Sequence, residues 1–306
     1  MKKTIYLLIF STLLIISCST SPSDDGKDHR LKVVATTGML HDAALNIGGE
    51  KIKASSIMGP GVDPHLYKAT QGDLRKFREA DLIIYNGLYL EGKMAEILEK
   101  QGKNRDVVAA AEVINKERLL SSPIYDNAYD PHVWFDVNLW KEVVTEICRS
   151  MQKVDEANAE FYEKNLGMYH SELDTLHSYV KKKLTEIPEQ QRILVTAHDA
   201  FGYFGRAYNI EVKGIQGVST LSDFGLKDIA ELIDLIIERN VKALFVETSV
   251  SQKGIEAVLE GCKQKGHNVK IGGYIYSDAM GEPGTIEGTY IGMVRHNALT
   301  ISEALK

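Results

Sequence analysis

The chain has 306 residues, of which 42 are aspartate or glutamate and 36 are lysine or arginine, for a formal net charge of −6. The basic residues form no stripe along the sequence, which argues against a nucleic-acid partner. Apart from Cys18, the cysteines are Cys148 and Cys262, which lie far apart on different predicted helices. They exclude a thiolate metal cluster, and both are expected to be small buried hydrophobes.

Residues 1–17 have the pattern of a cleaved export signal peptide. Lys2 and Lys3 precede an apolar run over 5–16, which is too short to span a bilayer comfortably. Cys18 follows Ser17 at the end of this run, as in the lipobox of bacterial lipoproteins, so we expect lipid on Cys18 to anchor the mature chain to a membrane. Residues 18–30 are then a lipidated flexible tether. The alternative is an uncleaved anchor with an incidental cysteine.

The next segment, 31–154, alternates strands with helices and is predicted to be an N-terminal α/β lobe. Short apolar runs such as 81–86 are typical of buried parallel strands. Strands are predicted at 32–37, 51–58, 81–86 and 107–110, and helices at 39–47, from Thr70 or Asp73 to 80, and at 91–100. This alternation predicts a mostly parallel sheet flanked by helices.

Residues 155–187 are predicted to form one long linking helix. The segment contains no proline, its only glycine is Gly167, and Pro188 follows its end. Asp155 is a candidate N-cap. One face is apolar, because large apolar residues recur at steps of three and four: Tyr162, Leu166, Tyr169, Leu173, Leu176, Val180 and Leu184. A coiled-coil partner helix is the alternative, but the position between two α/β halves favours a strut that joins them.

Residues 188–306 repeat the plan and are predicted to be a C-terminal α/β lobe. Strands are predicted at 192–197, 210–215, 242–246 and 269–274, and helices at 226–240, 252–265 and 287–304. The length of the mature chain suffices for two lobes with ordinary hydrophobic cores.

Two loops share the local sequence Asp-Pro-His, at 63–65 and at 130–132. Proline fixes its own φ and pushes the preceding residue toward an extended conformation, so His65 and His132 are expected to leave loops and not helix interiors. A single histidine is more often a core or surface residue than a metal ligand. Two copies of the same device suggest two imidazoles that point toward one site.

Two further polar side chains follow strands of the second half. His198 directly follows the strand at 192–197, and Asp278 follows the strand at 269–274 by a few residues. Ligand groups in open α/β sheets sit at the carboxyl ends of strands, so these residues could meet His65 and His132 between the lobes. Three neutral imidazoles and one carboxylate suit a divalent transition metal such as zinc or manganese.

These motifs, taken together, resemble the zinc/manganese solute-binding lipoproteins of ABC importers, the TroA-like family (periplasmic solute-binding protein family 9, cluster A-I). The resemblance covers nearly the whole chain from Cys18 and rests on the segments 61–65, 130–136, 196–203, 245–248 and 277–280. It implies two α/β lobes joined by one long helix, with the metal between the lobes. The ligands carried over by motif are His65, His132, His198 and Asp278.

The resemblance also implies a role and a location. The protein would be exported, lipid-anchored in the cell envelope and monomeric, and would pass Zn2+ or Mn2+ as its transported ligand to an ABC permease with its ATPase. Manganese-selective members often place glutamate where His198 stands, whereas zinc-dedicated members carry a histidine-rich loop that has no counterpart at 115–130. The metal is therefore zinc or manganese, and zinc should bind more tightly in vitro.

Carboxylates close to the ligands are candidates to orient the imidazoles, since a ligating histidine usually donates its other N–H to an oxygen. These candidates are Asp63, Asp130, Asp136, Asp199 and Glu247. Turn formation or helix capping is the competing interpretation for each. Trp134 and Phe135 are expected in the core, and the remaining histidines are expected at the surface or in structural roles.

Two other functions are open. A zinc hydrolase would use Glu247 as general base beside a three-ligand site with an open coordination position, but no His-Glu-x-x-His motif is present. An adhesin role has been attached to members of the family, but no residue pattern supports it separately. Four protein ligands leave little room for a metal-bound water and favour transport over hydrolysis, so we predict that the protein is not an enzyme.

Overall fold

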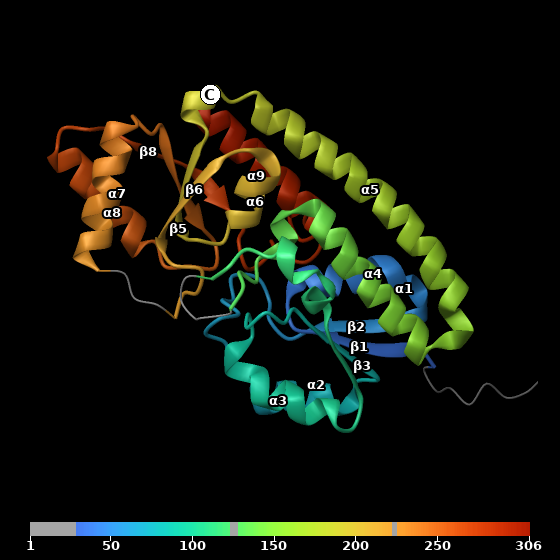
Figure 1. Ribbon diagram of the computed structural model, residues 1–306. Helices are drawn as coiled ribbons and strands as arrows, with labels where there is room; N and C mark the ends of the chain where they lie inside the picture. The colour runs from blue at the N-terminus through green and yellow to red at the C-terminus, as the bar shows by residue number, and fades with distance from the viewer. Residues whose placement is uncertain (1–28, 123–127, 222–224) are drawn as a thin grey trace, which may run out of the picture.

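The computed structural model describes residues 29–122, 128–221 and 225–306. It consists of two α/β halves, and Figure 1 shows a long helix running past both of them. The predicted signal peptide, Cys18 and most of the predicted tether lie outside the described residues. None of the helices in the described ranges combines the length and the hydropathy needed to cross a bilayer.

The N-terminal lobe contains a parallel four-stranded sheet in the order β2-β1-β3-β4. Its strands are β1 (Leu31–Ala35), β2 (Ile52–Ser56), β3 (Leu82–Tyr85) and β4 (Asp106–Ala109), and its first three helices are α1 (Gly38–Gly48), α2 (Gln71–Glu79) and α3 (Ala95–Gly102). Of the two candidate caps of α2, Thr70 occupies the N-cap, where its hydroxyl accepts the Asp73 amide in a capping box.

The C-terminal lobe contains a second parallel sheet, in the order β6-β5-β7-β8. Its strands are β5 (Ile193–His198), β6 (Glu211–Gln216), β7 (Ala243–Glu247) and β8 (Lys270–Ile275), and its helices are α6 (Gly202–Tyr208), α7 (Leu226–Glu238), α8 (Lys253–Gln264) and α9 (Tyr290–Leu305). Both lobes are therefore mostly parallel α/β layers, as predicted. The short helix α6 was not predicted.

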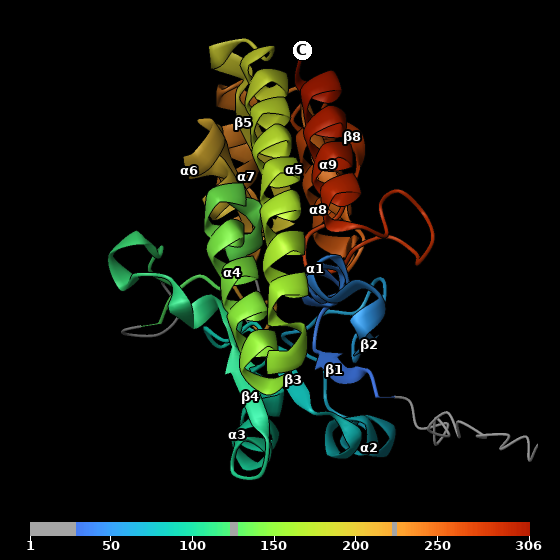
Figure 2. The same ribbon diagram turned by 90° about the vertical axis from the view of Figure 1, so that its right-hand side faces the viewer.

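The long helix differs from the prediction at its start. α5 spans Ala159–Thr185, so it is about 40 Å long. It begins after a short 3-10 turn, and the Asp155 carboxylate accepts hydrogen bonds from the Asn158 and Tyr162 side chains instead of capping α5. A further helix, α4 (Val137–Val154), precedes it and carries Cys148; the sequence places this cysteine on a predicted helix but gives no bounds for it. Figure 2 shows α4 and α9 beside α5, and residues of both pack against it.

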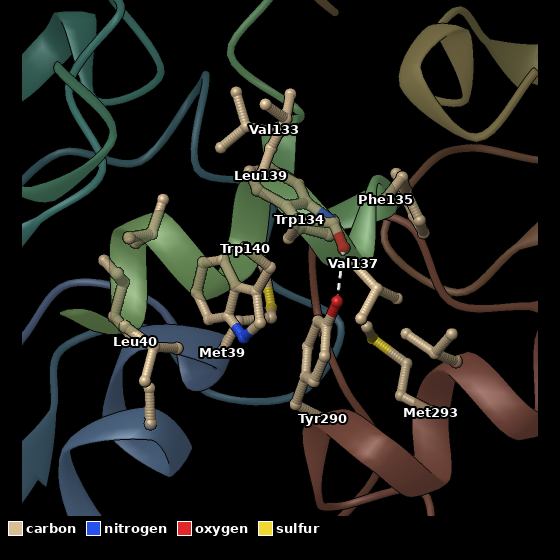
Figure 3. Packing of buried hydrophobic residues seen from close by; sticks show 14 of the residues in the cluster. Met39, Leu40, Val133, Trp134, Phe135, Val137, Leu139, Trp140, Tyr290 and Met293 are labelled. Carbon is tan, nitrogen blue, oxygen red and sulfur yellow. Dashed lines mark hydrogen bonds between the residues drawn. The ribbon is translucent and has the colours of Figure 1, made fainter. Parts of the chain in front are cut away.

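One hydrophobic core extends through both lobes. It includes residues of α1, α4, α5 and α9 together with the inner faces of both sheets. Figure 3 shows its centre, where Trp140 stacks on Tyr290 with ring centroids 5.0 Å apart and the Tyr290 hydroxyl donates to the Trp134 carbonyl at 2.7 Å. Trp134 and Phe135 are fully buried here, and Cys148 and Cys262 are buried, as predicted.

Candidate metal centre

Four loops or strand ends carry the predicted ligands into the space between the lobes. His65 lies in the loop between β2 and α2, and His132 precedes the 3-10 turn at Val133–Phe135. His198 is the last residue of β5, where the sequence had placed it just after the strand. Asp278 lies three residues beyond the end of β8. Each lobe therefore supplies two of the four side chains.

The structure brings these four side chains together. One ligand atom from each of His65, His132, His198 and Asp278 lies within 4.8 Å of all the others. The Nε2 atoms of His65 and His132 are 3.3 Å apart, and Nε2 of His198 lies 3.2 Å from Asp278 Oδ2. All four residues are at most 3% exposed. The convergence expected from strand-end positions is thus present.

Asp278 presents both carboxylate oxygens to the histidines. Oδ1 lies 3.3 Å from Nε2 of His132, and Oδ2 lies 3.7 Å from Nε2 of His65. Within the part of the chain that the structure describes, both oxygens and the His198 Nε2 are buried without a hydrogen bond. Buried polar atoms without partners are rare in native proteins, and a cation between them would satisfy all of them. The donor set therefore fits a divalent metal ion.

Carboxylates behind two of the histidines fix their rings. Asp130 Oδ1 accepts the backbone N–H of His132 at 2.9 Å and also lies 2.7 Å from its Nδ1. Glu247 accepts the backbone N–H of His198 through Oε1 at 2.8 Å, and its Oε2 lies 2.5 Å from the His198 Nδ1. The latter contact is an ion-pair distance without good hydrogen-bond geometry. Both arrangements leave Nε2 of each ring directed at the common centre.

The remaining carboxylate candidates lie differently. Asp63 accepts the backbone N–H of His65 through Oδ1 at 2.8 Å. Asp136 caps α4 by accepting the Asn138 amide and lies 3.7 Å from Arg206, which corresponds to the competing capping interpretation. Asp199 is only partly buried, and its backbone amide pairs with Gln216.

Asp278 is the carboxylate that faces all three imidazoles of the centre, and its electrostatics depend on them. Burial opposes the charge on Asp278, but His198 and His132 outweigh it and hold the pKa of Asp278 well below its ordinary value. Burial likewise lowers the pKa of His132, but Asp130 and Asp278 overcome this and raise it to about 9. For His65, burial and the two neighbouring imidazoles lower the pKa to about 3. Metal ligation requires unprotonated imidazole nitrogens and an ionised carboxylate, so a divalent ion would compete with protons at this centre.

The other described histidines, His29, His41, His170, His177, His267 and His296, are exposed or partly exposed and lie outside this group. A cavity of about 530 Å³ adjoins the centre between α1 and residues 278–289, and Asp278 and His41 form part of its wall.

Two contacts near the centre were not foreseen from the sequence. The Trp134 indole donates to the Ser277 carbonyl at 3.1 Å, and Thr220 donates to Asp63 at 2.6 Å. Each joins residues from different lobes. No local sequence signal marks either pair, because the partners lie 143 and 157 positions apart.

Comparison with protein families gives one match over almost the entire described chain. The family described as "Zinc-uptake complex component A periplasmic" matches residues 33–304. This range includes both sheets, the long helix and all four residues of the centre.

Individual relatives agree with this match. The manganese-binding lipoprotein MntA of Bacillus subtilis (strain 168) is 50% identical over 299 residues, covering 98% of this chain and 97% of the relative. The zinc-binding protein TroA of Treponema pallidum (strain Nichols) is 46% identical over 282 residues, covering 92% and 91%. The solved structure of periplasmic zinc-binding TroA superposes with a TM-score of 0.88 at 47% identity, covering 90% of this chain and 99% of that one.

Proposed function

Because this chain belongs to the family of periplasmic zinc-uptake complex component A proteins, we propose that it captures a divalent transition metal outside the cytoplasm and delivers it to an ABC permease for uptake. The observation that carries the proposal is the buried group of three imidazoles and one carboxylate, supplied equally by the two lobes. Its likeness to MntA and TroA, named as manganese-binding and zinc-binding proteins, supports the same conclusion.

The ligands in this proposal are His65, His132, His198 and Asp278, and the metal is cargo. Their burial supports tight binding, because few water molecules can compete for the coordination positions. Both Asp278 oxygens face the histidines, which favours more than four coordinating atoms and lets the site accept manganese as well as zinc. Zinc is expected to bind more tightly in vitro.

The hydrolase alternative is not supported. The relatives are named as binding proteins. Glu247, its candidate general base, is in contact with the backbone and Nδ1 of His198, on the side of that ring away from Asp278. It therefore supports a ligand and does not face a position where a metal-bound water could lie.

The proposal places the protein at the outer side of the cell membrane. Its relatives include manganese ABC transporter substrate-binding lipoproteins named PsaA, and the permease and ATPase partners follow from that class. We further propose that residues 1–17 are a signal peptide, that lipid on Cys18 holds the chain at the membrane through residues 18–30, and that the protein is a monomer.

Metal titration tests the proposed site. The protein is stripped with a chelator, and Zn2+ and Mn2+ are then titrated by calorimetry. His65→Ala combined with His132→Ala is expected to abolish the heat of binding, whereas His29→Ala combined with His170→Ala, which changes two histidines outside the centre, should leave it intact. Unchanged binding in the first pair would show that the assigned site is wrong. Elemental analysis of protein drawn from native cells identifies the metal that it carries there.

A further inference from the structure

The three histidines among the proposed ligands are not held equally well. His132 and His198 each have a carboxylate of their own lobe that contacts both the backbone N–H and the ring Nδ1. Among the described residues, His65 has no such carboxylate at its Nδ1, and Asp63 reaches only its backbone N–H. The His65 loop, residues 57–70, contains neither helix nor strand. Among the three histidines, His65 is therefore the ligand whose position depends most on its loop.

A hydrogen bond from the other lobe holds this loop. The Asp63 carboxylate is shared: Oδ1 accepts the His65 amide at 2.8 Å, and Oδ2 accepts the Thr220 hydroxyl at 2.6 Å. Thr220 follows β6 in the C-terminal lobe. Two residues before Asp63, Gly61 has φ +69, and a Cβ built there would lie 3.6 Å from the carbonyl oxygen of Thr248. The loop thus bonds to the C-terminal lobe at Thr220 and passes close to it at Thr248.

Other cross-lobe hydrogen bonds near the centre lie in the core. The Trp134 indole, which donates to Ser277, and the Tyr203 hydroxyl, which donates to the Asp130 carbonyl at 2.9 Å, belong to fully buried rings. Thr220 is partly exposed, and its hydroxyl donates to Asp63 at the surface of the lobe contact. A bond of this kind can open without disturbing core packing, whereas loss of either ring contact would disrupt it.

From this geometry we propose that Thr220 is a positioning residue for cargo retention: its hydroxyl, through Asp63, holds His65 on the metal, and opening of this bond starts metal release. The inference rests on the proposed function. A hydrogen bond to a charged carboxylate is among the stronger ones, so its loss is expected to speed metal dissociation by about tenfold. Association should change little, because the same ligands remain.

Thr220→Val, which removes the hydroxyl and keeps the side-chain shape, is the main test. Metal dissociation is measured by stopped-flow from the zinc-loaded protein into excess chelator, and association is measured separately. Thr220→Val should release zinc about tenfold faster, and Thr220→Ser should restore the slow rate. Thr175→Val makes the same change on the exposed face of α5, where the hydroxyl donates to the Ser171 carbonyl of its own helix, and should match the unmodified protein.

A purely structural role for Thr220 would lower the thermal stability of the metal-free protein, and Thr220→Val is expected to leave that stability unchanged. Dissociation of Thr220→Val within about twofold of the unmodified protein would overturn the inference, and so would failure of Thr220→Ser to restore the slow rate. If the unmodified protein bound neither zinc nor manganese, the proposed function itself would fail. The two failures are therefore distinguishable.

Discussion

Asp42 is a buried carboxylate whose substitution should stabilise the protein in a pH-dependent way. It lies on α1, is 9% exposed, and accepts the Tyr290 amide at the start of α9 at 3.1 Å and the Tyr169 hydroxyl of α5 at 3.4 Å. Burial raises the pKa of Asp42 from 3.8 to about 6, although these two hydrogen bonds oppose the increase. The ionised form of Asp42 is therefore less stable in the folded protein than in the unfolded chain, so ionisation of Asp42 lowers the free energy of unfolding.

The sign and the size of the effect follow from proton linkage. Between pH 3.8 and about 6 the folded state binds more protons at Asp42 than the unfolded state, so the free energy of unfolding falls as pH rises through this window. Above about pH 6 the free energy of unfolding falls no further on account of Asp42. A pKa shift of about two units corresponds to a total loss of about 3 kcal/mol. Asp42→Asn removes the titration and retains an oxygen that can accept the Tyr290 amide.

The assay is urea unfolding of both proteins from pH 4 to pH 7.5, with a chelator present because bound metal would add its own pH dependence. The free energy of unfolding of Asp42→Asn, minus that of the unmodified protein, should rise by about 2 kcal/mol between these limits, because Asp42 of the unfolded chain is already partly ionised at pH 4. A hydrogen bond lost in the variant would shift its free energy of unfolding by the same amount at every pH, so it does not affect how the difference between the two proteins changes with pH. A difference that stays constant with pH would refute the reasoning.

Other substitutions test the packing and the centre. Gly292→Ala would place a Cβ 1.8 Å from the Ile286 carbonyl oxygen and should sharply lower the thermal midpoint of unfolding. Gly167→Ala, on the exposed face of α5, meets no atom within 4 Å and should raise the midpoint, because alanine favours a helix more than glycine does. A midpoint equal to that of the unmodified protein would contradict either prediction. Leu173→Ala, at a fully buried position of α5, should cost about 2–5 kcal/mol in urea unfolding, and a cost near zero would argue against its packing. Glu247→Gln should weaken zinc binding by about tenfold to a hundredfold in calorimetry, and unchanged affinity would exclude its role behind His198.

The sequence predicts the two sheets and the meeting of the ligands because the signals for both are local. Apolar runs mark the central strands β3, β5 and β7, and His198 and Asp278 are tied to strand ends, so the parallel topology alone brings them to one edge. The prolines of the two Asp-Pro-His loops are also local signals, because each restricts the backbone so that the following histidine lies in a loop.

The sequence misses features of two kinds. In one kind a residue has two possible roles, and in the other two bonded residues lie far apart in the sequence. α4 has a readable apolar face with Trp140, Val143 and Ile147 buried, but the sequence allows Asp136 either to support the histidines or to cap a helix, and the structure has it as the N-cap of α4. Asp155 predicts a start of α5 that is too early for a similar reason. Its carboxylate accepts hydrogen bonds from the side chains of Asn158 and Tyr162, and it does not cap the helix. Thr220 could not be foreseen, because only the assembled fold brings it to Asp63.

The shared interior of the two lobes restricts how this protein can be divided or recombined. Trp140 of the first half and Tyr290 of the second are pressed face to face, and the Tyr290 hydroxyl ends on the Trp134 carbonyl beside the metal centre. Either half expressed alone would expose this surface to water. A chimera that took one half from a distant relative would have to inherit matching aromatic faces before its ligands could meet.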